Sequence, residues 1–304
     1  MLAWLGPDAP RPRGSTENAL ARCSRVEASV LAPDPLEAVA ETLLTSSTLV
    51  LSGAGVSTES GIPDYRGPAA AGRARRPITY QEFARSEAAR QRYWARSFAG
   101  WPFMAAREPN AGHLAIADLE RGGRITGVLT QNVDGLHQRG GSEVVLELHG
   151  NLREVRCLVC GALTQRTELQ ALLGRLNPGF EAVAARFAPD GDADVPDDLV
   201  ASFRVAPCPV CGGVLKPDVV FFGENVPKAT YEAARGMVDH AGALLVVGSS
   251  LTVLSGYRFV RQAKAAGKPV VIVNDGPTRA DGEADVKVAG RLGRLLPELA
   301  SLVL

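Results

Sequence analysis

The sequence has no uninterrupted apolar run near the roughly eighteen residues that a membrane-spanning helix needs. It also has no excess of charge, because 33 Lys and Arg residues balance 33 Asp and Glu residues. The first absence argues against a membrane protein. The second gives no support to nucleic acid or an anionic membrane as the main partner. With 304 residues, 46% of them apolar, the chain can form one large globular domain or two ordinary ones.

Cysteine is scarce as well, and four of the five cysteines fall in two CxxC pairs, Cys157 with Cys160 and Cys208 with Cys211. Such pairs suit a metal better than a disulfide framework and indicate a reducing compartment. We therefore expect a cytoplasmic protein, or a mitochondrial-matrix protein if the source is eukaryotic. Four thiolates leave no coordination position for water, so we expect one structural zinc per chain. Unrelated buried cysteines are the alternative.

Residues 1–33 lack any sustained hydrophobic period. A secretory signal needs a longer apolar core after a basic start, and none is present in this segment. A transit peptide is poor in acidic residues, whereas Asp8, Glu17 and Glu27 interrupt this segment. We expect a flexible N-terminal extension.

Beyond this segment, short apolar runs alternate with helical stretches. Asp34 and Pro35 begin the first helix, because aspartate caps a helix N-terminus and proline suits its first turn. The alternation predicts an α/β fold built on a doubly wound parallel sheet. The runs that we interpret as buried strands are 49–52, 125–130, 144–148, 219–222, 244–247, 270–273 and 286–288.

A glycine-rich turn, Gly53-Ala54-Gly55, follows the first predicted strand. A strand, such a turn and a helix start together make a pyrophosphate site, because backbone N–H groups and the helix N-terminus face the ligand. The glycines can also serve packing alone. The spacing departs from GxGxxG, and no acidic residue stands about twenty positions further on to hold a ribose. An ordinary dehydrogenase is therefore disfavoured.

Polar residues follow two other predicted strands. Gln131, Asn132 and Asp134 come after the run 125–130, and His149 comes after the run 144–148. Because ligands bind at the carboxyl ends of strands in open α/β sheets, we expect these side chains to converge on one crevice. A histidine with an ordinary pKa near 6.5 is a natural proton acceptor there.

Several longer motifs occur in a fixed order: GAGVSTESGIPDYR, TQNVDGLH, ELHGN, the two CxxC pairs, LKPDVVFFGE and VVGSSL. From about Asp34 to its C-terminus the chain resembles the sirtuins, which are NAD-dependent protein-lysine deacylases. STESGIPDYR together with RQRYWARSFAGW, APDGD and SGYRF resembles the class II branch that contains the mitochondrial lipoamidase-type sirtuin.

The resemblance implies NAD as a co-substrate, held by the glycine-rich turn and by residues at strand ends. Asp134 and the backbone near Ile62 would hold the nicotinamide amide, while Gln131 and Asn132 would order the ribose and a water. The implied contacts are Gly53, Ala54, Gly55, Thr58, Ile62, Asp64, Tyr65, Arg66, Gln131, Asn132, Asp134, Gly248, Ser249, Ser250, Asn274, Asp275, Gly276 and Leu292.

The same resemblance implies the catalytic residues His149, Asn132 and Asp134. In such enzymes the acyl-lysine oxygen attacks the anomeric carbon as nicotinamide leaves, and His149 would then take a proton from a ribose hydroxyl. That hydroxyl attacks the resulting alkylimidate carbon, and water then completes the release of lysine, nicotinamide and O-acyl-ADP-ribose. General-base help of this kind is worth on the order of 10²–10⁴ in rate.

Acyl-lysine proteins or peptides are the implied partners. Two backbone edges, 221–224 and 253–256, would receive the peptide between them as an added strand, with Phe222, Gly223, Glu224 and Val253 in contact. We expect a monomer that binds neither nucleic acid nor membrane.

Tyr93 and Arg96 are the candidate acyl-group residues, because Tyr-x-x-Arg places both on one helix face and resembles the pair of desuccinylase-type sirtuins. The planar fork of arginine can bind a carboxylate through two hydrogen bonds. Alternatively, Arg96 pairs with a surface acid and Tyr93 packs into the core. We expect longer acyl groups, glutaryl-like, hydroxymethylglutaryl-like or lipoyl, to be cleaved better than acetyl.

These assignments predict a Rossmann-like NAD-binding domain with a smaller zinc-binding and helical domain. We assign 34–68, 107–150 and 216–304 to the first, 69–106 to a helical and cofactor-loop insertion, and 151–215 to a zinc-binding insertion. Three functions stay open: a deacylase, a mono-ADP-ribosyltransferase and an NAD-sensing binding protein with negligible turnover. The target proteins, the preferred acyl group and the oligomeric state are not readable from the sequence.

Overall fold

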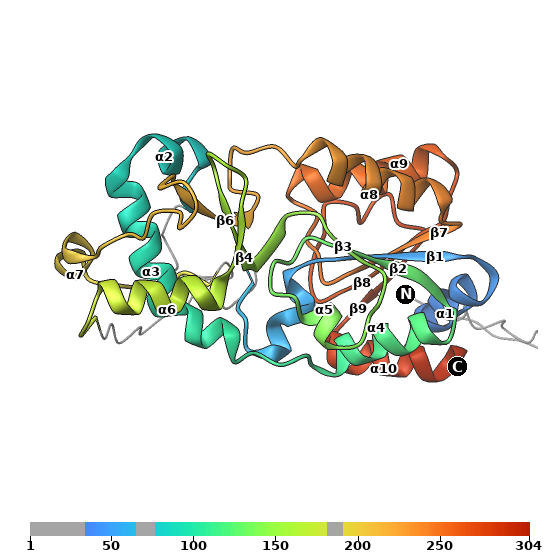
Figure 1. Cartoon of the computed structure of the whole chain (residues 1–304). Coiled ribbons are helices and arrows are strands. Elements are labelled where there is room, and N and C mark those ends of the chain that lie inside the picture. The colour runs from blue at the N-terminus through green and yellow to red at the C-terminus, as the bar shows by residue number, and fades with distance from the viewer. Residues whose placement is uncertain (1–33, 65–76, 181–190) are drawn as a thin grey trace, which may run out of the picture. The chain divides into compact units, whose positions relative to one another are not determined.

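The computed structural model describes residues 34–64, 77–180 and 191–304. A six-stranded parallel sheet, in the order β3-β2-β1-β7-β8-β9, forms the centre of the larger part (Figure 1). The chain winds outward from β1 in both directions, so the predicted doubly wound α/β fold is confirmed. The strands are β1 (Thr48–Ser52), β2 (Ile125–Thr130), β3 (Val145–Glu147), β7 (Ala243–Val247), β8 (Val270–Asn274) and β9 (Val286–Ala289).

Both faces of this sheet are covered, which is why β1, β7 and β8 are buried at every position and consist almost wholly of aliphatic residues. Successive side chains point to opposite faces. Val50 and Leu245 pack on the side of α1 (Pro35–Thr45), α4 (Ala111–Arg121) and α10 (Leu292–Val303). Leu49 and Val246 pack on the side of α8 (Lys228–His240) and α9 (Leu254–Ala265), the upper layer in Figure 1.

The first helix begins as the sequence predicts. The Asp34 carboxylate accepts a hydrogen bond from the Leu36 N–H over 2.8 Å, and Pro35 occupies the first position of α1. Asn110 caps α4 in the same way, with its Oδ1 accepting from the Gly112 N–H over 2.9 Å. These caps satisfy backbone donors that have no partner within the helix.

One predicted strand is placed wrongly. The run 219–222 is not a strand of the parallel sheet: β6 (Leu215–Val219) pairs antiparallel with β4 (Gly150–Cys157) in a separate three-stranded sheet, order β5-β4-β6, with β5 at Leu163–Gln165. An apolar run signals burial but not the partner that buries it. Here Phe221 is buried against the rings of Phe83 and Tyr93 from the helical insertion.

The three-stranded sheet and the helices α2 (Tyr80–Arg85), α3 (Glu87–Ala105), α6 (Arg166–Leu176) and α7 (Asp197–Ser202) share a second core. The helical stretch predicted from about residue 79 is confirmed, although it divides at Ser86, whose hydroxyl accepts from the Ala89 N–H and caps α3. Trp94 joins α3 to the small sheet by donating its indole N–H to the Leu215 carbonyl over 3.2 Å. The residue boundaries assigned to the domains stay a prediction.

Among the described residues, every helix is too short or too polar to cross a membrane. The predicted N-terminal extension lies outside the described residues.

Candidate active site

The glycine-rich turn packs directly on a second turn that follows β7. The Gly55 N–H donates to the Gly248 carbonyl over 2.8 Å. A Cβ added at Gly55 would lie 2.8 Å from that oxygen, and one at Gly53 would lie 2.8 Å from the Ser249 Cβ. The short 3₁₀ helix η1 (Ala54–Ser60) follows, rather than an α-helix. The glycines therefore allow the two turns to touch, which confirms their packing role, while their role in binding a pyrophosphate stays a prediction.

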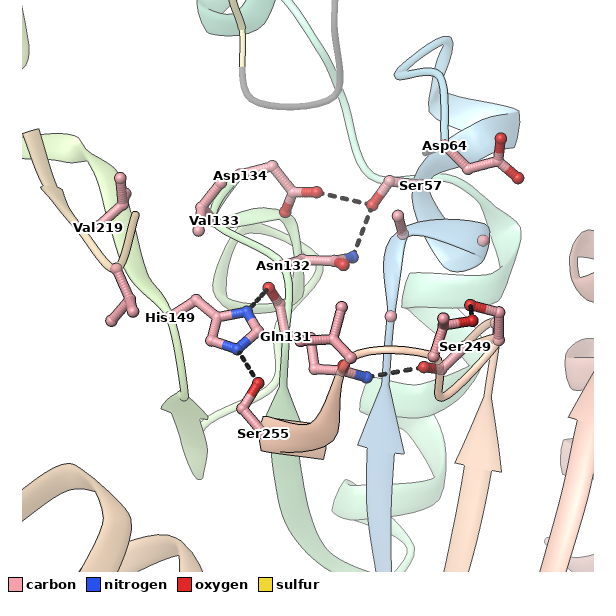
Figure 2. Close-up of a pocket in the computed structure, with 18 of the residues that line it drawn as sticks. Ser57, Asp64, Gln131, Asn132, Val133, Asp134, His149, Val219, Ser249 and Ser255 are labelled. Atoms are coloured by element: carbon pink, nitrogen blue, oxygen red, sulfur yellow. Dashed lines mark hydrogen bonds between the residues drawn. The ribbon is translucent and has the colours of Figure 1, made fainter. Parts of the chain in front are cut away.

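The residues that follow β2 are fixed by side chains from other elements. Asn132 donates its amide to the Ser57 hydroxyl over 3.1 Å, and Ser57 donates to Asp134 Oδ2 over 2.7 Å. Gln131 Nε2 donates to the Ser249 hydroxyl over 2.8 Å. Figure 2 shows Asn132 and Asp134 converging on Ser57, with Gln131 directed toward Ser249. These contacts bring the ends of β2 and β7 and the helix after β1 to one place, as the sequence predicts.

Asp134 is a buried carboxyl group whose pKa is raised. Burial raises its pKa, while hydrogen bonds from the Leu136 N–H and the Ser57 hydroxyl and the charge of Arg153 act in the opposite direction. The Leu136 N–H lies 2.9 Å from Oδ1, at the start of α5 (Leu136–Arg139). A carboxyl group with strong desolvation and few, directed partners is typical of a functional site.

His149 is held in one orientation by two hydrogen bonds. Its Nδ1 lies 3.0 Å from the Gln131 carbonyl oxygen, and its Nε2 lies 2.8 Å from the Ser255 hydroxyl (Figure 2). Because a carbonyl can only accept, Nδ1 carries the proton, and the lone pair of neutral imidazole is on Nε2. Burial lowers the pKa of His149, with the Gln131 contact opposing it. The residue is therefore prepared to act as a base through Nε2.

A cavity of about 2080 Å³ contains all of these groups. Small-molecule pockets are usually about 300–1,000 Å³, so this cavity has room for two ligands. Tyr65 and Arg66 lie outside the described residues, and the role of each lining residue toward NAD stays a prediction. The implied NAD contacts that line the cavity are Gly53, Ala54, Gly55, Thr58, Ile62, Asp64, Gln131, Asn132, Asp134, Gly248, Ser249, Ser250, Asn274, Asp275, Gly276 and Leu292.

The first predicted peptide-binding edge lines the same cavity through Phe222, Gly223 and Glu224. Part of its backbone is already in use, because the Phe222 carbonyl accepts from the Tyr80 N–H over 3.0 Å. Gln81 donates to the Gly223 carbonyl over 2.9 Å. Hydrogen bonds from α2 therefore hold one side of this edge in place.

The second predicted edge is extended only at Val253. Residues 254–256 form the first turn of α9, since the N–H groups of Gly256 and Tyr257 both donate to the Val253 carbonyl over 3.2 Å. The prediction of an extended edge over 253–256 is therefore wrong beyond its first residue. Gly256 lets the start of α9 approach Gln131 closely, because a Cβ at this position would lie 2.4 Å from Gln131 Oε1.

Of the two candidate acyl-group residues, Tyr93 lines the cavity and Arg96 does not. The Tyr93 ring is buried in edge-on contact with Phe83 and Trp94, with ring centroids 5.4 and 5.2 Å apart. Arg96 is half-buried one helical turn further along α3, and its carbonyl accepts from the Ala193 N–H. A role for Arg96 in acyl recognition stays a prediction.

The four predicted zinc ligands lie together, with all sulfur atoms within 4.8 Å of one another. Cys157 and Cys211 sulfurs are 3.5 Å apart, and Cys160 and Cys208 sulfurs are 3.8 Å apart. Tetrahedral zinc at about 2.3 Å from each sulfur places sulfurs about 3.8 Å apart, so the residues fit the ion. The N–H groups of Val159 and Val210 point at Cys157 and Cys208 sulfurs, and such contacts stabilise thiolate ligands.

Sequence reasoning gave no role to three residues of this region. Ser57 links Asn132 to Asp134, and Ser255 binds the base atom of His149. His137 donates or accepts at the Ser52 hydroxyl, 2.8 Å away, beneath the strand ends. Serines at turns and helix starts occur throughout the chain, so only the tertiary fold distinguishes these.

Residues 53–255 match the sequence profile of the Sir2 family, which is more than half of the 304-residue chain. The chain belongs to the Sir2 family. The sirtuin resemblance drawn from the motifs is therefore confirmed.

Two relatives and one solved structure illustrate this membership. The chain is 54% identical over 299 residues to NAD-dependent protein deacetylase 1 of Streptomyces coelicolor, covering 98% of this chain and 94% of the relative. It is 49% identical over 257 residues to the mitochondrial NAD-dependent protein lipoamidase sirtuin-4 of Bos taurus, covering 84% and 82%. A structure described as Sir2-p53 peptide-NAD+ matches with a TM-score of 0.70 and 30% identity, covering 88% of this sirtuin and 97% of that chain.

Proposed function

We propose that this sirtuin is an NAD-dependent protein-lysine deacylase that transfers the acyl group to ADP-ribose and releases nicotinamide. The observation that carries the proposal is the neutral, oriented His149, which faces a cavity shared with Asn132 and Asp134. The relatives named above are a deacetylase and a lipoamidase, and a similar structure holds a peptide and NAD.

Some residues of the cavity would bind NAD, and others would act on the acyl-lysine. Asp134 is held by Ser57 and the Leu136 N–H, and its remaining acceptor capacity suits the amide of nicotinamide. The touching turns at Gly55 and Gly248 present backbone groups to the phosphates and ribose of the dinucleotide. NAD supplies the electrophilic anomeric carbon once nicotinamide departs.

His149 supplies the proton acceptor. Its Nε2 lone pair is bonded to the Ser255 hydroxyl in the absence of substrate, and a ribose hydroxyl that replaces Ser255 can deliver its proton there. The Gln131 carbonyl then stabilises the proton on Nδ1 and keeps the ring in place. Zinc, held by the four cysteines, maintains the small sheet and takes no part in the chemistry.

We infer that the acyl group is longer than acetyl. Tyr93, Phe103 and Leu152 line the cavity together with Ile78 and Val133, and such a wall suits an extended acyl chain. A carboxyl group at the end of that chain would need a cation, and Arg96 is our candidate for it. If Arg96→Ala lowers kcat/KM for acetyl-lysine and glutaryl-lysine peptides by the same factor, Arg96 does not recognise the carboxylate.

A nicotinamide-release assay with and without acyl-peptide tests the proposed function. A deacylase releases nicotinamide and deacylated peptide in equal amounts, and only when acyl-peptide is present. Release that requires an unacylated protein acceptor, with ADP-ribose found on that acceptor, would replace this proposal by ADP-ribosyl transfer. Binding of NAD without any release would indicate a sensor.

A further inference from the structure

A group of four residues borders the cavity where α8 and α9 begin. We call Lys228, Tyr231, Leu254 and Arg258 the basic rim, and all four line the cavity. Lys228 and Tyr231 stand three residues apart on α8, while Leu254 and Arg258 stand four apart on α9, so each pair shares one face of its helix. The two faces meet because the Arg258 guanidinium lies over the Tyr231 ring, 5.0 Å from its centroid.

The positive charge of the basic rim is uncompensated within the described part of the chain. Neither Lys228 nor Arg258 is in an ion pair there, whereas Lys216 pairs with Glu224 and Arg235 with Glu232. Stacking on Tyr231 restricts the Arg258 side chain without neutralising it. The rim therefore presents two cations to whatever occupies this side of the cavity.

Acidic residues of the cavity do not offset these cations. Those described are Asp64, Asp134, Glu224 and Asp275, and none of them lies on α8 or α9. Asp134 is buried among Ser57 and Leu136, and Glu224 is paired with Lys216. The cavity lining on α8 and α9 thus carries two cations and no carboxylate, while Glu232, next to Tyr231 on α8, lies outside the lining and 3.7 Å from Arg235.

The basic rim lies beside the proposed path of the acyl-lysine peptide. One side of that path is Phe222, which is 44% exposed, and the chain runs from there directly into α8 at Lys228. The other side is Val253 with Leu254, which is 61% exposed. Ser255, which bonds the base atom of His149, stands between Leu254 and Arg258 on α9. Residues flanking an acyl-lysine placed near His149 must therefore pass the rim.

We propose that this sirtuin selects acyl-lysines that have an aspartate or glutamate close to them in an extended segment. The proposal rests on the deacylase function above and specifies the class of protein substrate. A carboxylate beside the acyl-lysine would meet Lys228 and Arg258, with the planar Arg258 able to bind it through two hydrogen bonds. Exposed ion pairs are individually weak, so the preference should be moderate and should fall with ionic strength.

A positional peptide scan tests the proposal. One acyl-lysine peptide is prepared with glutamate, glutamine or lysine at each of the three positions on either side of the acyl-lysine. Both kcat/KM and peptide affinity by fluorescence anisotropy are measured at about 20 mM and about 500 mM salt. At low salt we expect glutamate at one or two positions to improve both quantities about three- to ten-fold over glutamine, and most of the gain to vanish at high salt.

Variants then assign the preference to the rim. Arg258→Glu should reverse it, so that the lysine-substituted peptide becomes the better ligand, and Lys228→Gln should reduce it about two- to three-fold. Arg261→Gln is the matched control, because it removes the same charge from an exposed position of α9 that does not line the cavity. Its glutamate-to-glutamine ratio should equal that of the unmodified protein.

The possible results distinguish the selection of acidic segments from the deacylase function. Equal kcat/KM and equal affinity for glutamate and glutamine peptides at low salt would overturn the selection, as would a preference that Arg258→Glu leaves unchanged. Absence of turnover on every peptide, with the affinity preference intact, would instead remove the deacylase function and keep the acidic-segment site.

Discussion

Two hydrogen-bond partners and burial determine the protonation and the orientation of His149. The Gln131 carbonyl fixes the proton on Nδ1, the Ser255 hydroxyl occupies Nε2, and burial lowers the pKa. We expect His149→Ala to lower kcat by at least about 10²-fold, because the general base is lost, while the melting temperature stays close to that of the unmodified protein. Turnover of an acyl-peptide and thermal melting are the two measurements, with His240→Ala, an exposed position on α8, as control. A folded His149→Ala protein with full activity would remove the mechanism.

The pH dependence of the same residue follows from its lowered pKa. Only neutral imidazole accepts the proton, so activity is lost as pH falls through the pKa of His149 in the folded protein. Because burial lowers that pKa, the acid limb of kcat/KM should lie below the ordinary histidine value of 6.5. A limb at or above pH 6.5 that disappears in His149→Ala would contradict the assignment.

Two further histidines are buried without a role in proton transfer. Desolvation lowers the pKa of His113 to about 4, and desolvation and the nearby His113 lower that of His137 to about 3. Between pH 6.5 and those values the unfolded chain binds more protons than the folded one. Each histidine therefore contributes stability that is complete above pH 6.5 and is lost as pH falls.

This linkage can be measured as the slope of the free energy of unfolding against pH. For one histidine the free energy of unfolding should fall by up to about 1.4 kcal/mol per pH unit on acidification below pH 6.5. His137→Asn should make that slope shallower, whatever it does to stability at neutral pH. The measurement is denaturant unfolding at several pH values between 7 and 5. An identical slope in His137→Asn would mean that His137 is protonated with little penalty in the folded state.

Site residues could be predicted from the sequence where a polar side chain directly follows a recognisable strand. Asn132, Asp134 and His149 are polar residues at strand ends, and strand ends are readable from apolar runs. Ser57 and Ser255 were not predicted to act, because a serine gives no signal until its neighbours in space are known. Helical spacing brings Arg96 to the Tyr93 face, but Arg96 does not line the cavity, so its role in acyl recognition stays a prediction.

At the scale of elements, the segment after β6 is closed by one buried cation. The Lys216 side chain is 7% exposed, and its Nζ lies 3.0 Å from Glu224 Oε2, which also accepts from the Phe221 N–H over 2.9 Å. Nζ donates to the Val219 carbonyl as well. This clamp fixes the backbone of 219–224, the segment that we propose to contact the peptide.

We expect Lys216→Met to weaken peptide binding more than NAD binding. Methionine keeps the apolar stem but leaves Glu224 without its cation, so unfolding should become easier by about 1–3 kcal/mol and KM for acyl-peptide should rise about ten-fold. The Lys216→Met and Glu224→Gln double variant should recover part of the stability, since no unpaired charge remains. Equal changes in KM for peptide and for NAD would show that the clamp is not specific to the peptide side.

The sequence predicted which segments are buried strands and helices, but it did not always predict which other segments they pack against. The buried runs of β1, β7 and β8 identify a parallel sheet because both faces are apolar. The run 219–222 is apolar as well, yet it lies outside that sheet: aromatic rings of the helical insertion bury Phe221, and Phe222 is exposed. The first turn of α9 escaped prediction because residues 254–256 were interpreted as part of an extended edge, whereas the helix already begins at Leu254.

For the whole molecule, the four-cysteine site is a feature that holds the smaller part of the fold together, because it joins the end of β4 to the segment before β6. Four sulfurs within 4.8 Å of one another repel once ionised, and only a cation makes that arrangement favourable. We expect one zinc per chain by elemental analysis, and Cys157→Ser should lose it together with solubility. Cys23, the one cysteine outside the CxxC pairs, provides the control Cys23→Ser. A metal-free Cys157→Ser protein that is stably folded and active would end the structural role.

The join between the two sheets has a mechanical consequence. His149 is followed immediately by Gly150, which begins β4 with φ of +79°, and a Cβ there would lie 2.0 Å from the Asp218 carbonyl oxygen. Because His149 directly precedes β4, a tilt of the three-stranded sheet would also move the imidazole. Hydrogen bonds to Gln131 and Ser255 hold that ring in its orientation. The four cysteines do not line the cavity, yet a zinc ion held by them would help to keep the imidazole aligned. Damage to the zinc site should therefore reach catalysis through misalignment before it reaches the larger sheet through unfolding.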